Sequence, residues 1–247
     1  MRIKVIACKV LLRQLYQLAA QSPNTVDIAW MRQELHETPD KMRLALQAAI
    51  DAVEAEDERY DAIALGYGLC SNGTAGLTAR KTPLVIARGH DCITLLLGDK
   101  QRYRTLFDGG KGGIYWFAQG WIENAQMPSK ERYDALYKAY EEKYGEDNAA
   151  YLLEMEQTWM REYTQAIFVR WPAEGGHLAA LDDDGERFTR RSAETFGWAY
   201  SCQHGDDALL RDLIGGAWDE ARFLTVQPGQ TVAASNDERI VIARDAS

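Results

Sequence analysis

Residues 60–98 read YDAIALGYGLCSNGTAGLTARKTPLVIARGHDCITLLLG, and this stretch decides the expected fold. It contains two short apolar runs, at residues 62–65 and 83–87, and short runs bounded by turn residues predict buried strands. Each run is followed by a polar loop with a cysteine, Cys70 in the first loop and Cys92 in the second. Ligands of open α/β sheets bind outside the carboxyl ends of the strands, so we expect the two thiols to share one site.

The remainder of the N-terminal region alternates apolar runs with helical patterns. Residues 3–7 and 27–31 predict two more strands, and residues 9–20 and 39–54 carry apolar side chains at helical spacing. Strands that alternate with helices are typical of parallel sheets covered by helices on both faces. We therefore expect an α/β fold with a doubly wound, mostly parallel sheet.

Several residues have the chemistry of helix ends. Thr38 is expected to cap the helix that follows it, with Pro39 at the first helical position. Asp91 is expected to cap the helix after the second cysteine loop, and Gly98 is expected to end that helix. Residues 74–80 predict a further short helix.

The middle of the chain has a different character. Residues 109–123, GGKGGIYWFAQGWIE, predict either a lid or pocket wall or a tight turn anchored by aromatic packing. Residues 128–144 and 146–163 predict two charged helices. We expect one α/β domain over the whole chain, with the aromatic segment and this helical hairpin inserted over residues 109–164.

The C-terminal third is expected to complete the sheet. Its polar segment, residues 172–191 with an acidic run at 182–184, predicts a solvated turn and lacks the full spacing of a calcium loop. The other predicted elements are strands over residues 166–170, 197–201, 223–226 and 239–243, and a helix over residues 206–214.

Composition limits the classes of partner. The chain has 247 residues and a net charge of −9, which argues against nucleic-acid binding and against an anionic membrane surface. No apolar run approaches the ~20 residues that a membrane-spanning helix needs. The apolar N-terminus is interrupted by basic residues and has no cleavage site, so we expect no signal peptide. Four cysteines without an export signal predict a cytoplasmic protein with reduced thiols.

Every cysteine falls at or just after the end of a predicted strand. A parallel sheet would place three of these thiols along one edge, and the positive ends of helices are expected to stabilise the thiolates of Cys70 and Cys92. Thiolates suit zinc as the first choice of metal and an iron–sulfur cluster as the second. No C-x-x-C zinc spacing is present, so this prediction depends on topology. The predicted metal ligands are Cys8, Cys70 and Cys92, and Cys202 and His204 have no assigned role.

Other side chains near the same loops are candidates for catalysis or cofactor binding. His36 could be a ligand, a base or only a polar neighbour of a helix start. Arg88 could pair with an anionic ligand or with an acidic surface. The candidate catalytic residues are His36, His90 and Asp91, and the candidate cofactor-binding residues are Arg88, Tyr67 and Trp116.

Six strings spread along the chain are specific enough to suggest a relationship: VIACKVL, LHETP, LGYGLCSNG, ARGHDCITLLLG, IYWFAQGWIE and WDEARFLTVQPGQ. They resemble a domain-of-unknown-function family of bacterial and archaeal proteins. The family pattern includes Cys8, His36, Cys70, His90, Asp91 and Cys92. Members are often encoded beside corrinoid-dependent methyltransferases, so the resemblance implies methyl or one-carbon transfer with a corrinoid protein as partner.

Three functional hypotheses remain open. The first is a metal-dependent enzyme that acts on a small-molecule substrate at the thiol site. The second is a non-catalytic accessory protein that holds a metal, an iron–sulfur cluster or a corrinoid, with the charged helices as its docking surface. The third is a metal-free enzyme with Cys92 as nucleophile and His36 or His90 as base. Tyrosines that recur on one face of the helix over residues 128–144 also suggest a homo-oligomer.

Overall fold

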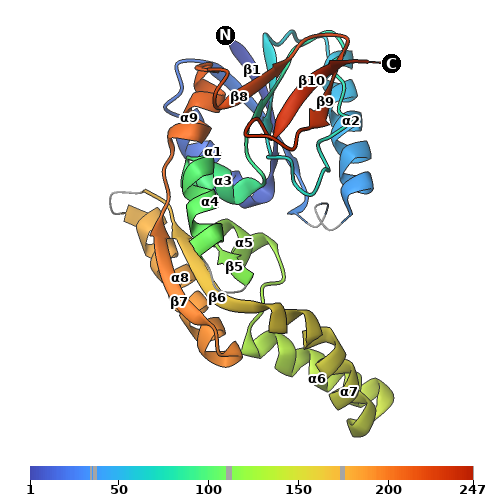
Figure 1. Ribbon diagram of the computed structural model, residues 1–247, viewed down its shortest axis with the longest axis vertical. Helices are drawn as coiled ribbons and strands as arrows, with labels where there is room; N and C mark the ends of the chain where they lie inside the picture. Colours follow the sequence, from blue (N-terminus) through green and yellow to red (C-terminus); the bar gives the residue numbers. More distant parts are fainter. Residues whose placement is uncertain (34, 36–37, 110–112, 173–175, 247) are drawn as a thin grey trace. The chain divides into compact units, whose positions relative to one another are not determined.

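The computed structural model describes residues 1–33, 35, 38–109, 113–172 and 176–246 (Figure 1). The chain forms two compact units, which are described separately below. The first unit consists of Met1–Arg104 and Gly205–Ser247, and the second unit consists of Thr105–His204. The insertion predicted over residues 109–164 lies within the second unit. No helix among the described residues is long and apolar enough to cross a membrane.

The first unit is built on a five-stranded sheet with the order β2-β1-β3-β4-β8. The first four strands of this order are parallel, and β8 runs antiparallel to β4. The sequence prediction of a doubly wound, mostly parallel sheet is confirmed. The strands are β1 (Arg2–Cys8), β2 (Thr25–Met31), β3 (Ala62–Gly66), β4 (Leu84–Ala87) and β8 (Phe223–Val226).

The two central strands β3 and β4 are buried along their whole length. Strands buried on both faces read as continuous apolar runs, which is why their sequences predicted them. Gly66 pairs with Ala7 of β1, and a Cβ atom at Gly66 would lie only 2.5 Å from the Ala7 Cβ. The close approach of β1 and β3 at their carboxyl ends therefore requires a glycine at this position.

Helices cover both faces of this sheet. α1 and α3 pack against α9, and α9 packs against β3 and β4, whereas α2 packs against β1 from the other side (Figure 1). Right-handed crossovers require this arrangement, since α1 leads from β1 to β2 and α2 leads back from β2 to β3. The helices of this unit are η1 (Lys9–Leu11), α1 (Leu12–Ala19), α2 (Pro39–Ala55), α3 (Cys92–Leu97), α4 (Lys100–Gly109, which extends past the unit boundary) and α9 (Ala208–Gly215).

One local prediction in this unit was wrong. Residues 74–80 do not form a helix, because their backbone pairs with the hairpin of β9 (Gln230–Ala234) and β10 (Val241–Asp245). The N–H group of Gly76 donates to the carbonyl oxygen of Val232 at 2.7 Å. Thr38 is the N-cap residue of α2 and Pro39 is its first residue, as predicted, although among the described residues the Thr38 side chain accepts no hydrogen bond from the first turn.

The second unit has its own parallel sheet, with the order β5-β6-β7. Helices α6 and α7 form the hairpin that the sequence predicted, joined at Gly145 with φ +81°. The elements are β5 (Gly113–Phe117), α5 (Gln119–Asn124), α6 (Lys130–Tyr144), α7 (Glu146–Gln157), η3 (Thr158–Glu162), β6 (Tyr163–Arg170), α8 (Gly176–Phe196) and β7 (Ala199–His204).

The polar segment after β6 is the helix α8 and not the predicted turn. Its buried positions are Asp182, Gly185, Thr189, Ser192 and Ala193. These residues are small or polar, and the charged residues between them led to the prediction of a turn, although apolar residues such as Leu181 and Phe188 recur on the same face of the helix. Asp182 is buried because its carboxylate accepts a hydrogen bond from the backbone N–H of Trp171 at 2.8 Å.

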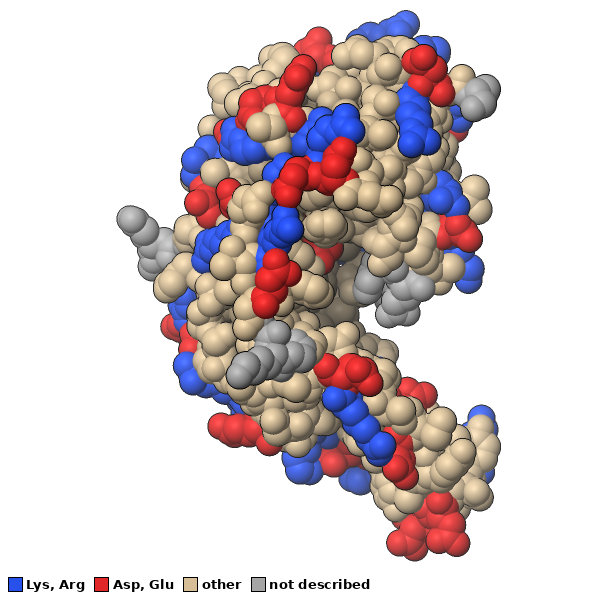
Figure 2. Space-filling model, viewed as in Figure 1, with Lys and Arg blue, Asp and Glu red and all other residues tan. Residues whose placement is uncertain are grey.

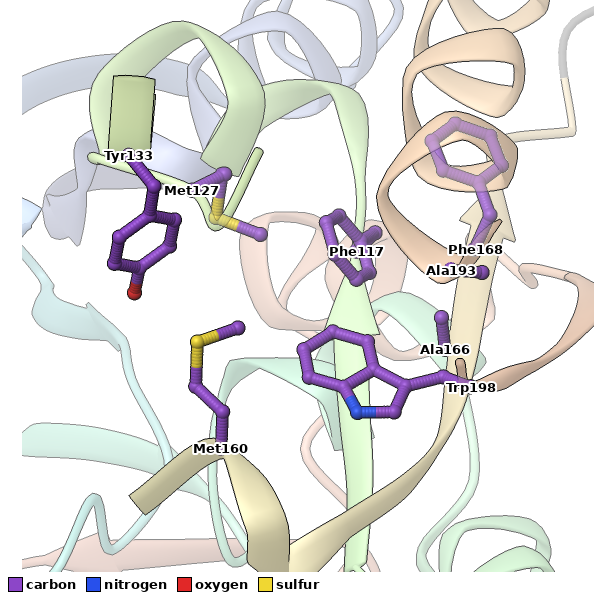
Figure 3. Packing of buried hydrophobic residues seen from close by; sticks show 8 residues of the cluster. All are labelled: Phe117, Met127, Tyr133, Met160, Ala166, Phe168, Ala193 and Trp198. Atoms are coloured by element: carbon purple, nitrogen blue, oxygen red, sulfur yellow. The ribbon is translucent and has the colours of Figure 1, made fainter. Parts of the chain in front are cut away.

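The aromatic segment over residues 113–117 is the strand β5, so the predicted tight turn was wrong there, and its role as a lid or pocket wall stays a prediction. Phe117 is fully buried in the core of the second unit (Figure 3). Tyr115 stacks on Trp198, with ring centroids 5.5 Å apart. The core cluster consists of Phe117, Met127, Tyr133, Met160, Ala166, Phe168, Ala193 and Trp198.

Candidate functional site: three cysteines at a strand-order reversal

The strand order of the first unit reverses between β1 and β3. The chain leaves β1 towards β2 at one edge, and then returns past β1 to build β3 and β4 on the other side. The connections at the carboxyl ends of β1 and β3 therefore diverge. Divergence of this kind opens a crevice, and it is where doubly wound proteins bind their ligands.

Three cysteines lie at this reversal. Cys8 is the last residue of β1, Cys70 lies in the loop after β3, and Cys92 is the first residue of α3 after β4. The three thiols interact electrostatically with one another and with the hydroxyl of Tyr67, which lies in the same loop as Cys70. The structure thus brings together the three cysteines and Tyr67.

Backbone hydrogen bonds tie the loop after β3 to the loop after β4. The Leu69 N–H donates to the Gly89 carbonyl oxygen at 2.8 Å, and the Cys70 N–H donates to the His90 carbonyl oxygen at 2.7 Å. Gly68 makes this contact possible, since a Cβ atom there would lie 2.6 Å from the Gly89 oxygen. These backbone hydrogen bonds therefore hold the two cysteine loops against each other.

The chain at Cys70 adopts an uncommon backbone. Cys70, Ser71 and Asn72 are consecutive left-handed residues, with φ values of 47°, 53° and 68°. The left-handed region costs roughly 1–2 kcal/mol for a residue with a Cβ atom, so the surrounding structure must hold this turn. Thr74 contributes, because its buried hydroxyl donates to the carbonyl oxygens of Gly68 at 3.1 Å and Leu69 at 3.3 Å.

Burial dominates the electrostatics of the thiols. It raises the pKa of Cys8 to about 11 and that of Cys70 to about 12, and it also raises the pKa of Cys92. Backbone hydrogen bonds from Gly68 and Cys92 lower the pKa of Cys70 only in part. We expected helix ends to stabilise the thiolates, but desolvation outweighs that effect, so the thiols are neutral in the absence of a cation.

Two buried hydroxyls lie in the same region. Tyr67 is 3% exposed and Thr94 of α3 is fully buried. Within the part of the chain that the structure describes, the Thr94 hydroxyl has no hydrogen-bond partner, and the Tyr67 hydroxyl has only the weakly bonding thiol of Cys8 beside it. Native proteins rarely leave buried polar atoms unsatisfied, so such atoms at a crevice point to a ligand or to water.

The predicted catalytic residues have different surroundings. One carboxylate oxygen of Asp91 accepts hydrogen bonds from the N–H groups of Ile93 and Thr94, and the other accepts from the Tyr103 hydroxyl at 3.0 Å. The helix cap predicted for Asp91 is therefore present, and Gly98 ends the helix with φ +75°. Burial raises the pKa of Asp91.

Of the two candidate histidines, the structure describes only His90. His90 is exposed, and its ring centroid lies 6.1 Å from that of Tyr103. His36 lies outside the described residues, so its predicted role stays a prediction.

Arg88 lies after β4 and points to the C-terminal segment of the first unit. Its guanidinium donates to the carbonyl oxygens of Glu220 at 2.8 Å, Phe223 at 3.2 Å and Arg239 at 3.0 Å, and also to that of Val241. These hydrogen bonds occupy the guanidinium donors with backbone carbonyl oxygens. The contacts therefore support a role for Arg88 as an anchor of the C-terminal strands.

The other predicted residues belong to the second unit. Trp116 lies in β5, and Cys202 and His204 lie in β7. Burial raises the pKa of Cys202, which interacts with Glu186 and Tyr200. Sequence reasoning missed Thr74, in the loop after β3, and Tyr103 of α4, because each acts through one hydroxyl and leaves no motif.

The side chains as they stand do not enclose a metal position. Among the described residues, no group of three or more His, Cys, Asp or Glu side chains is arranged to hold a metal ion. The donor set itself is soft and suits zinc or an iron–sulfur cluster. Rotation about χ1 moves a cysteine sulfur by about 3 Å, so a change of rotamer alone alters the distances between the three thiols.

The fold and the site define an α/β protein with three neighbouring cysteines at its strand-order reversal. The chain belongs to a family of proteins of unknown function (DUF1638), which matches residues 30–214. This confirms the predicted membership in a domain-of-unknown-function family. The match includes Cys70 and Cys92, whereas Cys8 precedes it. No curated protein and no solved structure matches the chain.

Proposed function

We propose that the protein is a metal-dependent enzyme whose metal is bound by Cys8, Cys70 and Cys92. The supporting observation is that three cysteines from the ends of three parallel strands meet at the strand-order reversal. Zinc is the first choice of metal, and an iron–sulfur cluster with one open iron is the second. A zinc ion with an open position supplies Lewis-acid chemistry when bound.

The raised thiol pKa values favour this proposal over a metal-free cysteine nucleophile. A reactive cysteine needs a cationic neighbour or a base that lowers its pKa, and here burial raises it. A metal ion is the cation that would displace the protons of buried thiols. The backbone hydrogen bonds to Cys70 would then support its thiolate.

The residues around the thiols have separate roles in this proposal. Thr94 offers an unpartnered hydroxyl to a small-molecule substrate, and the Tyr67 hydroxyl beside Cys8 offers a second one. Asp91 positions Cys92 through its cap of α3. Methyl or one-carbon transfer with a corrinoid protein is the finer form of the proposal, and it rests on the family resemblance alone.

Metal content tests the proposal directly. The protein is purified without oxygen, its metals are measured by elemental analysis, and an ultraviolet–visible spectrum is recorded. We expect about one zinc per chain, lost in Cys8→Ala, Cys70→Ala and Cys92→Ala. Cys202→Ala, in the second unit, is the matched control and is expected to keep the metal.

The possible outcomes separate the alternatives. Iron with sulfide and a broad visible band would select the cluster. Turnover of a methyl donor by the loaded protein would support an enzyme, and stable loading without turnover would support a carrier. Wild-type metal content no higher than that of the triple cysteine variant would rule out the metal site.

A further inference from the structure

The exposed apolar side chains of the described chain are concentrated in one hairpin. Four of its eight exposed large hydrophobic residues lie between residues 144 and 159. Single exposed apolar residues are ordinary, but a concentration of them marks an interaction surface. These four are Tyr144, Tyr151, Met155 and Trp159, which are 45%, 62%, 54% and 39% exposed.

Three of these residues form a stripe along α7 and its continuation η3. Tyr151, Met155 and Trp159 follow one another at intervals of four residues, so they lie on one helical face. The opposite face of α7 contains the buried Ala149 and the half-buried Leu153, and it packs against α6. Tyr151 and Met155 therefore lie on the side of α7 that the hairpin does not need for its own packing. The ring of Trp159 also packs on those of Tyr115 and Tyr163, at centroid distances of 5.8 and 5.7 Å, so Trp159 adds only its exposed part to the stripe.

The charged residues around the stripe indicate the sign of the charge on its partner. α7 contains four acidic residues and no basic residue. Asp147 lies one turn before Tyr151 on the stripe side, and the hairpin over residues 130–162 has nine acidic and five basic residues. Acidic side chains gather at the free end of the hairpin, at the bottom of Figure 2. A second copy of this face would be repelled, whereas a basic partner would be attracted.

We propose that the α7 stripe, Tyr151, Met155 and Trp159, docks a partner protein that presents an amphipathic helix with a basic polar face. Apolar residues at helical spacing on the partner would pack on the stripe. Its lysine or arginine residues would face Glu146 and Asp147, which lie in the first turn of α7. Aromatic and methionine side chains are the types that dominate such contacts.

A synthetic peptide tests this proposal with the full-length chain. The probe is a dye-labelled amphipathic helix of about five turns made of leucine and lysine, and fluorescence anisotropy measures its dissociation constant. The double variant Tyr151→Ser/Met155→Ser is expected to weaken binding about tenfold. Leu44→Ser, which removes a 71% exposed apolar residue of α2, is the matched control and is expected to have no effect. Circular dichroism checks that both variants are folded.

Each other result would overturn the proposal. No binding of the leucine–lysine peptide, or equal binding of a leucine–glutamate peptide, would remove the charge argument. Equal binding by the wild type and the double variant would show that the stripe is not the site. Sedimentation velocity gives a further check: a dimer that the double variant abolishes would assign the stripe to a second copy of the chain.

Discussion

The backbone N–H of Cys70 donates a hydrogen bond to the carbonyl oxygen of His90 at 2.7 Å. This bond joins the loop after β3 to the loop after β4, two strands that are neighbours in the sheet. It places Cys70 beside the first turn of α3, where Cys92 lies. The thiol site therefore depends on the contact between two loops, and variants that separate them are expected to lose it.

A side chain at Gly68 is expected to force these loops apart. A Cβ atom there would lie 2.6 Å from the Gly89 oxygen and 2.7 Å from the Asp91 nitrogen, and neither backbone atom can move easily. Gly68→Ala should lower the free energy of unfolding by about 2–4 kcal/mol, measured by urea denaturation. Gly215→Ala is the control, since a Cβ atom there meets nothing within 4 Å. Equal stability of the two variants would refute the steric argument.

Loss of the Arg88 side chain is expected to destabilise the C-terminal strands. Its guanidinium satisfies four backbone carbonyl oxygens, those of Glu220, Phe223, Arg239 and Val241. Arg88→Ala should lower the free energy of unfolding by about 2–3 kcal/mol. Arg80→Ala removes an exposed ion pair with Asp51 and should cost less than about 0.5 kcal/mol. If Arg88 serves a cofactor instead, its loss would leave the stability of the metal-free protein unchanged.

The buried thiols of the metal-free protein are expected to react slowly. A pKa of about 11 for Cys8 leaves about 100-fold less thiolate at pH 8 than the ordinary pKa of 9.0 would. Labelling by iodoacetamide at pH 8, followed by peptide mass spectrometry, should be slow at Cys8 and Cys70 in the folded protein. The denatured protein provides the reference rate for each peptide. Labelling of folded Cys8 at that reference rate would contradict its burial.

The second unit is expected to lose stability in acid through Glu186. Hydrogen bonds from Arg170 and Arg190 lower the pKa of this carboxyl from 4.5 to about 2. A lowered pKa means that the stabilisation is complete above pH 4.5 and is lost as the pH falls towards 2. In Glu186→Gln, the free energy of unfolding should fall by about 1–2 kcal/mol less on acidification than in the wild type, after an allowance for solvent screening. Urea denaturation followed by tryptophan fluorescence at several pH values measures it.

Protonation of the buried Asp182 changes the stability in the opposite direction, so its contribution must be separated from that of Glu186. Burial raises its pKa from 3.8 to about 6, so protonation between pH 6 and pH 4 stabilises the folded state. The wild type should therefore gain stability on mild acidification and lose it below pH 4.5. Glu194→Gln, at an exposed position of α8, is the control and should keep the wild-type profile. An unchanged profile in Glu186→Gln would show that its ion pairs contribute nothing.

Local physics explains which elements the sequence predicted well. β3 and β4 are buried on both faces, so their apolar runs are unbroken and their ends are marked by turn residues. Asp91 and Gly98 act within a single turn of chain, where side-chain chemistry decides the conformation. The hairpin of α6 and α7 was recognisable for the same reason, since helices depend on neighbours three and four residues apart.

Elements that depend on distant contacts were missed. α8 buries Asp182 and Gly185, whose partners are a backbone N–H at Trp171 and the ring of Phe168, and its charged residues obscured the helix in the sequence. Residues 74–80 pair with β9, which lies about 150 residues further along the chain, and no local pattern reports such a pairing. β5 was obscured by glycines that precede its aromatic residues.

The sequence by itself determined the parallel strands of the first unit and the position of Cys8, Cys70 and Cys92 at their carboxyl ends, because strand burial and turn chemistry are local properties. Only the tertiary structure decided that β1 and β3 are neighbours at the strand-order reversal, that Gly68 packs against Gly89, and that Arg88 faces inward to the C-terminal carbonyls. It also decided that the pKa values of the Cys8 and Cys70 thiols are raised and not lowered, since desolvation depends on everything packed around a sulfur atom and not on its place in the chain.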